Sequence, residues 1–356
     1  MLTAIGLMSG TSMDGIDAAV LRTDGETVEG FGPALTHPYR SEFRQRLRDV
    51  MGVERGSRTA AIEEELTRLH QAAVDILVEE NSINISNIDV IGFHGQTIFH
   101  QPEARVTVQL GDGAGLAGRL GVPVAWDFRT ADVLAGGQGA PFVPLFHAAL
   151  TRGRELPVAV VNIGGVANVT WIGGADEILA FDTGPGNGPL DDWILRQTGQ
   201  GFDRDGAIAA RGHADLARVD AVLERAYFSR KPPKSLDRSE FSADLAAGLA
   251  LADGAATLAE ITAHTIAAAR HHFPRPPKAW ILCGGGRRNL HLVGRLRELL
   301  SPAAVIDSDR LGWNGDALEA QAFAFLAVRV LRGLPLSLPT TTGVPYPMPG
   351  GRISRP

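Results

Sequence analysis

The chain has 356 residues, 44% of them hydrophobic, with 42 glycines and a formal net charge of −6 at pH 7. This length suffices for two domains of ordinary size. The basic residues are scattered, which argues against a nucleic-acid partner, because a phosphate backbone is bound by a concentrated basic patch. No apolar stretch approaches the roughly 20 residues of a membrane span and no signal-peptide pattern is visible, so we expect a cytoplasmic protein. The single cysteine, Cys283, excludes an intrachain disulfide.

The first predicted element is a β-hairpin whose turn is rich in glycine. Apolar runs flank the turn SGTSMDG at residues 9–15. Gly10 and Gly15 permit backbone geometries and a close ligand approach that other residues do not allow. The turn also contains three hydroxyl side chains, Ser9, Thr11 and Ser12. It is either a phosphate-binding loop or an ordinary hairpin, and recurrence of the pattern along the chain favours phosphate.

The first half continues as an α/β domain with polar strand ends. Helical periodicity over residues 59–80 leads into a short buried strand at 88–93. Further strands are predicted at 106–110 and 123–126, and each strand ends in a polar loop. Loops at strand ends are where ligand-binding residues gather.

A dinucleotide-binding fingerprint appears in miniature as GAGLAG at residues 113–118. The helix that it would open is cut short by GVP at residues 121–123, and Asp132, near the expected acidic position, is predicted in a loop. We therefore interpret the small residues as close helix packing. A Walker A motif is excluded, because Gly-Lys-Ser and Gly-Lys-Thr do not occur.

The second half repeats the opening pattern of strand, glycine turn and strand. The string VAVVNIGGVANVT at residues 158–170 is the second copy, and AWILCGGG at 279–286 is a partial third. This third copy leads into a helix with apolar periodicity at 290–300. A mostly apolar helix over 316–331 is followed by a tail whose prolines and glycines forbid long regular structure.

Two such hairpins and a late glycine turn resemble the ATP site of the actin, hexokinase and Hsp70 superfamily. The resemblance implies an α/β fold with two similar actin/hexokinase-like (ribonuclease H-like) domains and a nucleotide cleft between them. We expect the N-terminal domain at residues 1–150 and the C-terminal domain at 151–332, with the tail at 333–356 packing on the first.

A carboxylate at a predicted strand end is the catalytic candidate. The apolar strand at 178–181 delivers Asp182 into the loop TGPGNGP, residues 183–189. A hydroxyl kinase needs a base that accepts the proton of the nucleophile, and a rigidly held aspartate can do this. An Asx-turn or helix-capping aspartate would leave the same pattern, and the residues alone do not decide between the two.

Loop residues of the first half suit contacts with a polar substrate. His94, Arg129 and Gln138 follow predicted strands, and an arginine fork binds a carboxylate bidentately. The alternatives are a histidine that hydrogen-bonds its surroundings and a salt bridge from Arg129 to Asp127 or Asp132. No His, Cys and carboxylate cluster has the spacing of a structural zinc site.

Motifs along nearly the whole chain resemble the anhydro-N-acetylmuramic acid kinase family. They are GLMSGTSMDGIDAAV, GFHGQTIFHQP, QLGDG, DFRTADVLAGGQGAPFVP, NIGGVANVT, FDTGPGN, LCGGGRRN and GWNGDALEAQAFAFLA. GTSMDG and FDTGPGN are specific to the family rather than to the superfamily. The segment KSLDRSEF at 234–241 differs from the threonine-glycine form of many members.

The resemblance implies that ATP phosphorylates the six-position oxygen of 1,6-anhydro-N-acetylmuramic acid while water opens the anhydro bridge, in peptidoglycan recycling. The products would be N-acetylmuramic acid 6-phosphate and ADP. Asp182 would activate the water, and the departing bridge oxygen would accept the γ-phosphoryl group. The implied cofactors are ATP and Mg²⁺, the partner is a small amino sugar, and a homodimer is compatible with the sequence.

Matching motifs assign the remaining site residues. The expected nucleotide contacts are Ser9, Gly10, Thr11, Ser12, Met13, Asp14, Gly15, Ile16, Gly164, Gly165, Gly285 and Asn289. The expected substrate contacts are His94, Arg129, Gln138 and Glu319. Members of the superfamily usually carry an acid where this chain has Met8, so contacts linked to the metal would come from Asp14, Asp17 or water.

Two other functions stay open on the sequence alone. One is a simpler sugar kinase of the same superfamily, in which Asp182 deprotonates a substrate alcohol. The other is an ATP-switched binding protein of the Hsp70 or actin type, although the chain lacks a separate peptide-binding module.

Overall fold

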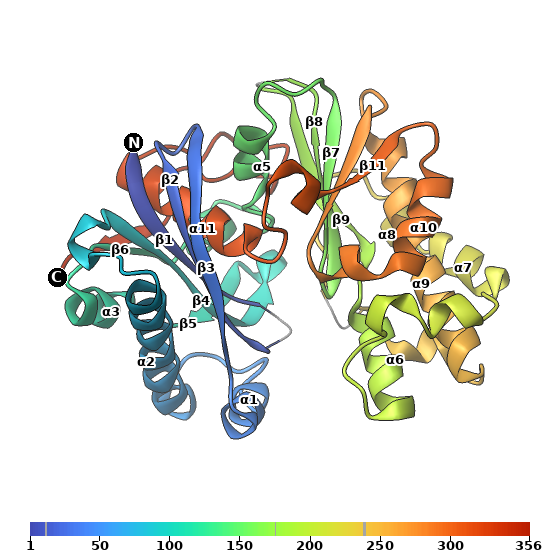
Figure 1. Cartoon of the computed structure of the whole chain (residues 1–356), viewed down its shortest axis with the longest axis horizontal. Helices are drawn as coiled ribbons and strands as arrows, with labels where there is room; N and C mark the ends of the chain where they lie inside the picture. Colours follow the sequence, from blue (N-terminus) through green and yellow to red (C-terminus); the bar gives the residue numbers. More distant parts are fainter. Residues whose placement is uncertain (11–12, 175, 238–239) are drawn as a thin grey trace. The chain divides into compact units, whose positions relative to one another are not determined.

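The computed structural model describes residues 1–10, 13–174, 176–237 and 240–356. Thr11 and Ser12, two of the expected nucleotide contacts, therefore lie outside the described residues. The chain separates into two compact units (Figure 1). Unit 1 comprises Met1–Arg152 with Ala317–Pro356, and unit 2 comprises Gly153–Asp316.

Unit 1 contains a mixed sheet with the strand order β12-β6-β4-β1-β2-β3, and β5 pairs with β4. The strands are β1 (Leu2–Ser9), β2 (Gly15–Thr23), β3 (Val28–Pro38), β4 (Val90–Gln101), β5 (Val106–Leu110), β6 (Val124–Trp126) and β12 (Arg352–Ser354). β1 and β2 form the predicted antiparallel hairpin, whereas β1, β4 and β6 run parallel. The C-terminal ends of these parallel strands therefore lie at one edge of the sheet.

Helices cover both faces of this sheet. They are α1 (Ser41–Arg48), α2 (Ser57–Glu80), α3 (Gly113–Leu120), α4 (Thr130–Leu134), α5 (Pro144–Leu150) and α11 (Leu318–Leu331). One apolar core joins α2 and α3 to inward-facing strand residues such as Leu7 and Phe93. In α3, a Cβ atom on Gly113 would lie 2.3 Å from Cγ of Trp126, so this glycine of the GAGLAG string allows close helix packing, whereas Gly118 has no atom within 4 Å of its Cβ position.

The position of α11 corrects the domain boundary expected from the sequence. Residues 317–332 were assigned to the C-terminal domain, but α11 packs on β1, β2 and β4 of unit 1. Gly6 and Gly92, which are paired in neighbouring strands, make a flat patch for this helix. A Cβ atom on Gly6 would lie 1.7 Å from the carbonyl oxygen of Ala320, and one on Gly92 would lie 2.0 Å from that of Phe323. Only strands without side chains at these two positions can accept the helix backbone so closely.

Unit 2 contains a second sheet with the strand order β11-β10-β7-β8-β9. Its strands are β7 (Val158–Ile163), β8 (Val166–Ile172), β9 (Ile178–Pro185), β10 (Ala279–Cys283) and β11 (Ala304–Asp307). Its helices are α6 (Gly188–Thr198), α7 (Leu216–Leu223), α8 (Ala226–Ser229), α9 (Leu251–Ala268) and α10 (Leu290–Leu299). The predicted hairpin is β7–β8, and α9 and α10 bury their apolar faces against the sheet.

Short 3-10 helices complete the two units. They are η1 (Ile85–Asn87), η2 (Pro102–Ala104), η3 (Arg204–Gly206), η4 (Ala209–Arg211), η6 (Ala243–Ala246), η7 (Ala269–His272), η8 (Gly285–Arg288) and η9 (Ser308–Leu311). Among the residues that the structure describes, no helix combines the length and the apolar character needed to cross a membrane.

Candidate active site

The first glycine turn, between β1 and β2, is supported by buried hydrogen bonds. Ser9 is 1% exposed, and its hydroxyl group donates to Oε1 of Gln96 at 2.5 Å and lies 2.7 Å from the hydroxyl of Tyr39. Nε2 of Gln96 in turn donates to the carbonyl oxygen of Gly10 at 3.2 Å. The Ser9 hydroxyl therefore holds the turn in shape from inside the unit, although the sequence suggested it as a donor to phosphate.

Among the described residues after Gly10, Met13 and Ile16 have buried side chains. Met13 has a left-handed backbone with φ of 53°, and its N–H donates to the carbonyl oxygen of Gly10 at 3.1 Å. The side chains of Met13 and Ile16 are buried in the core, so these residues can offer a ligand only their backbone. A Cβ atom on Gly15 would lie 2.5 Å from the carbonyl oxygen of His37. The Asp14 side chain, by contrast, is exposed.

In unit 2, two glycine segments meet at the end of the β7–β8 hairpin. The N–H of Asn187 donates to the carbonyl oxygen of Gly164 at 2.7 Å, and the N–H of Gly186 donates to that of Gly165 at 3.0 Å. The Asn187 side chain also donates to the carbonyl oxygen of Ile163 at 3.2 Å. The hairpin turn and the loop after β9 are thus one hydrogen-bonded body, and the sequence analysis did not single out Asn187. The glycines on both sides of it in GPGNG were the available signal.

The third glycine segment, after β10, lies beside the other two. Gly284 has φ of +75°, and a Cβ atom there would lie 2.3 Å from Oδ1 of Asn162. A Cβ atom on Gly286 would lie 2.9 Å from Oδ1 of Asn187, so this segment also contacts the loop after β9. Asn289 caps α10, since its Oδ1 accepts from the N–H of Leu292 at 3.0 Å. The expected nucleotide contacts of unit 2 are therefore gathered at one end of its sheet.

A buried arginine holds the last glycine segment in place. The Arg287 guanidinium is surrounded by Asp307, Asp309 and Asp316, with N–O distances of 3.5, 3.0 and 2.7 Å. These carboxylates offset the burial of the charge, and the hydrogen bonds that they accept raise the pKa of Arg287 above its usual range. This role of Arg287 could not be predicted from the sequence, because its three partners are distant from it along the chain.

Asp182 is 9% exposed and lies within β9, which continues to Pro185. The expectation that the strand ends before Asp182 is therefore wrong, because residues up to Pro185 still pair with β8. One carboxylate oxygen, Oδ2, accepts from the N–H of Leu236 at 2.8 Å. The backbone of Asp182 is held as well, because its N–H donates to the carbonyl oxygen of Lys234 at 3.0 Å and its carbonyl oxygen accepts from the Tyr227 hydroxyl at 2.6 Å. The carboxylate does not cap α6, whose N-cap residue is Asn187. The helix-capping alternative is therefore wrong for this residue.

In unit 1, the buried His94 contacts the half-buried Arg129. Nδ1 of His94 lies 2.8 Å from the carbonyl oxygen of Gly95, so Nδ1 carries the proton and Nε2 is left to accept from Nε of Arg129 at 3.1 Å. Burial, and then the neighbouring guanidinium, hold the pKa of His94 well below its ordinary value. Arg129 also donates to the carbonyl oxygen of Gly139 at 2.5 Å. A neutral histidine thus orients the arginine.

The two aspartates that could have neutralised Arg129 have other partners. Asp127 pairs with Arg352 at 2.9 Å. Asp132 accepts from the N–H of Gly139 at 2.7 Å and from the Thr342 hydroxyl at 2.6 Å. These contacts tie both loops of unit 1 to its C-terminal tail.

The other expected substrate contacts lie close to this pair. The carbonyl oxygen of Gln138 is 2.9 Å from Nε2 of His100, which fixes the loop that precedes Gly139. Glu319 lies in the first turn of α11, one turn before Phe323, whose ring centroid is 4.6 Å from that of His94. The structure therefore gathers the candidate sugar-binding residues in unit 1, while Asp182 lies in unit 2.

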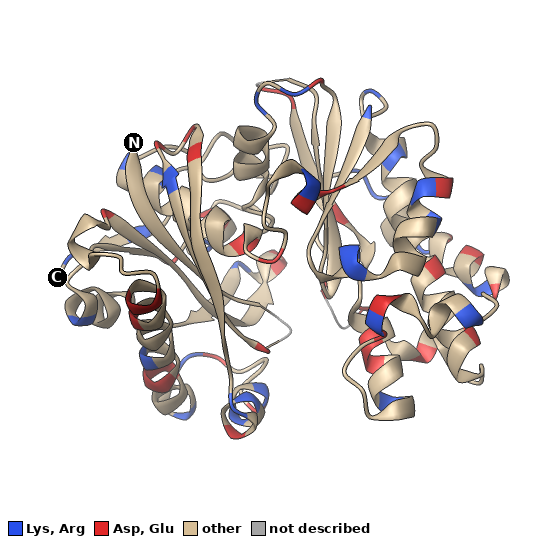
Figure 2. Ribbon diagram, in the orientation of Figure 1, with Lys and Arg blue, Asp and Glu red and all other residues tan. Residues whose placement is uncertain are grey.

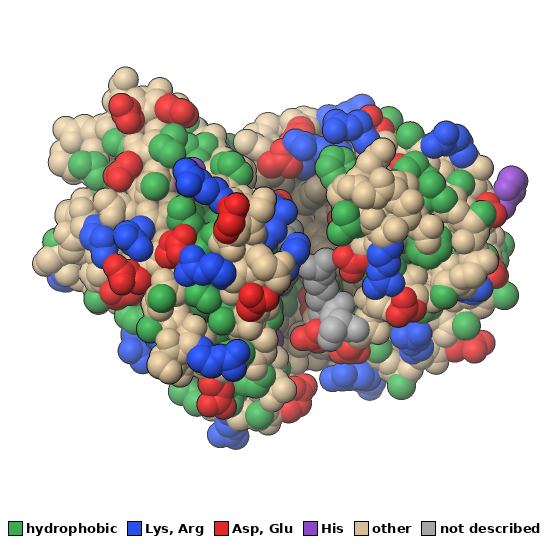
Figure 3. All heavy atoms as spheres, turned by 90° about the horizontal axis from the view of Figure 1, so that it is seen from below, with side chains coloured by type: hydrophobic (Ala, Val, Ile, Leu, Met, Phe, Trp, Pro, Cys, Tyr) green, Lys and Arg blue, Asp and Glu red, His purple; other side chains and the backbone are tan. Residues whose placement is uncertain are grey.

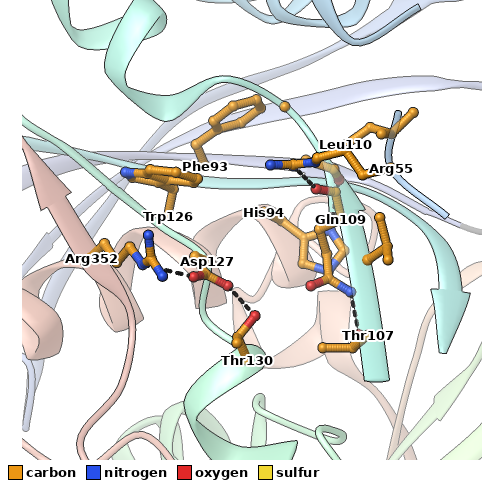
Figure 4. Close-up of a pocket in the computed structure, with 13 residues that line it drawn as sticks. Arg55, Phe93, His94, Thr107, Gln109, Leu110, Trp126, Asp127, Thr130 and Arg352 are labelled. Carbon is orange, nitrogen blue, oxygen red and sulfur yellow. Dashed lines mark hydrogen bonds and ion pairs between the residues drawn. The ribbon is translucent and has the colours of Figure 1, made fainter. Parts of the chain in front are cut away.

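A hollow of 280 Å³ opens in unit 1 beside the middle of β4, β5 and the C-terminal end of β6 (Figure 4). Phe93 and Trp126 form an apolar wall, and polar side chains point toward the opposite side. The polar residues that line it include His94, Gln109, Asp127 and Arg352. Asp127 has a left-handed backbone with φ of 55°, an uncommon conformation for a residue other than glycine. A partly apolar hollow with convergent polar groups is typical of a small-molecule site.

Comparison with known proteins identifies the family. The family described as anhydro-N-acetylmuramic acid kinase matches residues 2–354. A protein of that description from Acidiphilium cryptum is 54% identical over 99% of this chain and 98% of its own length. One from Rhodospirillum rubrum is 53% identical over 98% of this chain and 93% of its own length.

A solved structure supports the fold. Component A of (R)-2-hydroxyglutaryl-CoA dehydratase from Acidaminococcus fermentans has a TM-score of 0.50 at 13% identity, covering 92% of this chain and 99% of that one. The two α/β units are of the expected actin/hexokinase-like class. A kinase of this kind takes its phosphoryl group from ATP. Because the family match spans nearly the whole chain, the protein belongs to the anhydro-N-acetylmuramic acid kinase family.

Proposed function

We propose that this enzyme phosphorylates the six-position oxygen of 1,6-anhydro-N-acetylmuramic acid and opens the anhydro bridge with water in the same reaction. The observation that carries the proposal is the Asp182 carboxylate, which is 9% exposed and oriented by the Leu236 N–H beside the glycine loops. A carboxylate fixed in this way suits a general base, because geometry and proton acceptance are supplied together.

The proposed steps balance as follows. Asp182 takes a proton from water, and the water oxygen bonds to the anomeric carbon while the bond from that carbon to the bridge oxygen breaks. The released oxygen then bonds to the γ-phosphorus of ATP, and the bond from that phosphorus to the β–γ bridging oxygen breaks. The products are N-acetylmuramic acid 6-phosphate and ADP, and Asp182 later releases its proton. We further propose that the reaction is a step of peptidoglycan recycling in the cytoplasm, in which the substrate comes from cell-wall fragments.

We place the sugar in unit 1, beside the pair formed by His94 and Arg129. Arg129, held by His94, is the group best suited to an anionic part of the sugar, and Gln138 and Glu319 are further contacts. Of these expected contacts, His94 also lines the hollow of Figure 4. We place the phosphates at the glycine turns, where backbone N–H groups and close approach favour an anion.

The residues near the first turn fit Mg²⁺ bound chiefly by phosphate oxygens and water. In the part of the chain that the structure describes, no three His, Cys, Asp or Glu side chains form a group able to hold a metal ion. Mg²⁺ in kinases usually takes only one or two carboxylates, and the exposed Asp14 is the one that we propose. When bound, the ion would neutralise charge on the phosphates.

Labelling with oxygen-18 tests the hydrolytic step. Turnover of ATP and anhydro-N-acetylmuramic acid in oxygen-18 water should place the label on the anomeric hydroxyl, because water supplies that oxygen. Unlabelled product kept in the same water for the same time measures background exchange. Product without label above this background would refute water attack. Faster turnover of free amino sugars than of the anhydro sugar would favour the simpler sugar kinase instead.

A substitution at Gly186 tests whether the joined glycine segments bind ATP. In Gly186→Ala the new Cβ would lie 2.2 Å from the carbonyl oxygen of Gly164, so the loop and the hairpin turn must separate. We expect the Kd for ATP to rise at least about tenfold, since phosphate donors lose their alignment. Gly201→Ala is the control, because no atom lies within 4 Å of its Cβ position. Equal ATP affinity in equilibrium dialysis for both variants would place the nucleotide elsewhere.

The surface charge is consistent with small-molecule substrates rather than nucleic acid. Lys and Arg are interspersed with Asp and Glu on the ribbons of both units (Figure 2). On the face in Figure 3, charged and hydrophobic side chains are likewise mixed. A basic stripe of the kind that tracks a phosphate backbone is not visible on that face. A homodimer is the assembly to test first, by light scattering.

A further inference from the structure

The first residues of the segment at 234–241, of which the structure describes 234–237 and 240–241, contact Asp182. The carbonyl oxygen of Lys234 accepts from the N–H of Asp182 at 3.0 Å, and the N–H of Leu236 donates to the Asp182 carboxylate at 2.8 Å. The segment thus makes one backbone hydrogen bond to the edge of β9 and also orients the Asp182 carboxylate. Any movement of the segment would turn the carboxylate.

A tyrosine holds the same residue from α8. The hydroxyl of Tyr227 donates to the carbonyl oxygen of Asp182 at 2.6 Å in a buried site. Burial, and then the nearby Asp182 charge, raise the pKa of Tyr227 well above its usual value, so this hydroxyl keeps its proton. The N–H, the carbonyl and the carboxylate of Asp182 therefore each have a partner on α8 or on the segment.

The Lys234 ammonium group connects the segment to α8. Lys234 is 3% exposed, and its Nζ donates to the carbonyl oxygens of Tyr227 at 3.0 Å and Phe228 at 3.3 Å. Nζ also lies 4.7 Å from the ring centroid of Tyr227 and 5.6 Å from that of Phe181. Among the described residues, its partners are carbonyl groups, aromatic faces and a histidine, and no carboxylate forms an ion pair with it. A buried charge arranged in this way costs stability, so a role beyond packing is expected.

We propose that Lys234 and Tyr227 are positioning residues, which lock α8, the segment and β9 together so that the Asp182 carboxylate points in one direction. This inference rests on the proposed role of Asp182 as the base. Lys234 does not touch the carboxylate. It acts through the segment, whose Leu236 N–H makes that contact. A shift of about 1 Å in a reacting group can cost roughly 100-fold in rate.

The proposal predicts a pH dependence. Burial, and then the charge of Arg230, lower the pKa of Lys234 to about 8. The other titratable groups that contact the ammonium are His272 from η7 and Tyr227 from α8. The protonated form makes the contacts described, so it is present at neutral pH and is lost as the pH rises through about 8. We therefore expect kcat to fall above that pH.

The test compares three variants at neutral pH. Lys234→Met keeps the side-chain length but removes the charge, and we expect kcat to fall about 100-fold with KM for both substrates nearly unchanged. Tyr227→Phe keeps the ring under the ammonium and removes one hydrogen bond, for which we expect a fall of about tenfold. Lys231→Met is the matched control, because Lys231 is an exposed lysine shortly before the segment, and wild-type kcat is expected.

The pH profile separates positioning from a merely structural role. The wild type and Lys231→Met should lose kcat above about pH 8, whereas Lys234→Met should be slow throughout and show no such fall. A folded Lys234→Met with the wild-type kcat and profile overturns the inference, and so does a variant that loses only melting temperature. If Lys234→Met does not fold, an unchanged kcat in Tyr227→Phe overturns it. An active Asp182→Asn enzyme would instead refute the proposed function itself.

Discussion

Asp182→Asn is expected to lower kcat by about 1,000-fold while leaving the Kd for ATP unchanged. General base catalysis contributes roughly 100-fold to 10,000-fold, and asparagine cannot accept the proton at neutral pH. The amide has the same shape as the carboxylate, so its oxygen can still accept from the Leu236 N–H and the local structure should persist. The measurements are steady-state turnover of the anhydro sugar and equilibrium binding of ATP.

Asp176→Asn is the matched control for this substitution. Asp176 is an exposed aspartate just before the other end of the same strand, so its replacement should leave kcat and ATP binding as in the wild type. Loss of ATP binding in Asp182→Asn, in parallel with turnover, would show that Asp182 is structural. Retained turnover would remove it from the mechanism.

Gly92→Ala is expected to destabilise unit 1 by about 3 kcal/mol or more, at the upper end of the usual cost of overpacking. The added Cβ would lie 2.0 Å from the backbone carbonyl oxygen of Phe323, and a backbone cannot rotate away as a side chain can. Gly6→Ala should act in the same way, since its Cβ would lie 1.7 Å from the carbonyl oxygen of Ala320. Thermal unfolding measures the loss, and any folded variant should also have a raised KM for the sugar, because α11 carries Glu319 and Phe323.

Gly118→Ala controls for the loss of a glycine. Gly118 is exposed in α3 with no atom within 4 Å of its Cβ position. Alanine is favoured over glycine in a helix by about 0.5 to 1 kcal/mol, so this variant should unfold at the wild-type temperature or slightly above it. If Gly6→Ala and Gly92→Ala unfolded at that temperature too, the close contact of α11 with the sheet would not be needed for stability.

Local sequence patterns predicted the elements on which the site is built. Three such elements are the hairpins β1–β2 and β7–β8 and the strand, glycine turn and helix from β10 to α10. Their sequence signals, an apolar run next to glycines, span only a few neighbouring residues. The strand that carries Asp182 followed from the same reasoning, but β9 continues to Pro185, so Asp182 lies within the strand and not at its end. Patterns of this kind are set by backbone geometry over a few residues, which a single sequence shows.

Contacts between distant segments were not predictable in the same way. The sequence suggested the Ser9 hydroxyl as a donor to phosphate, but it forms hydrogen bonds with Gln96 and Tyr39 inside the unit. The segment after α8 looked like an atypical motif, but Lys234 and its neighbours hold Asp182. In each case the partner is selected by shape and hydrogen bonding across the fold, and these cannot be read from neighbouring residues.

The sequence by itself determined the family, the α/β class, the three glycine segments and the carboxylate that we propose as the base. Those features depend on local composition and motif spacing. Only the tertiary structure decided that α11 belongs to unit 1, that His94 orients Arg129, and that Lys234 and Tyr227 support Asp182. These features depend on the burial of Gly6 and Gly92, of the neutral His94 and of the Lys234 ammonium. Burial is decided by packing between residues that lie far apart in the chain.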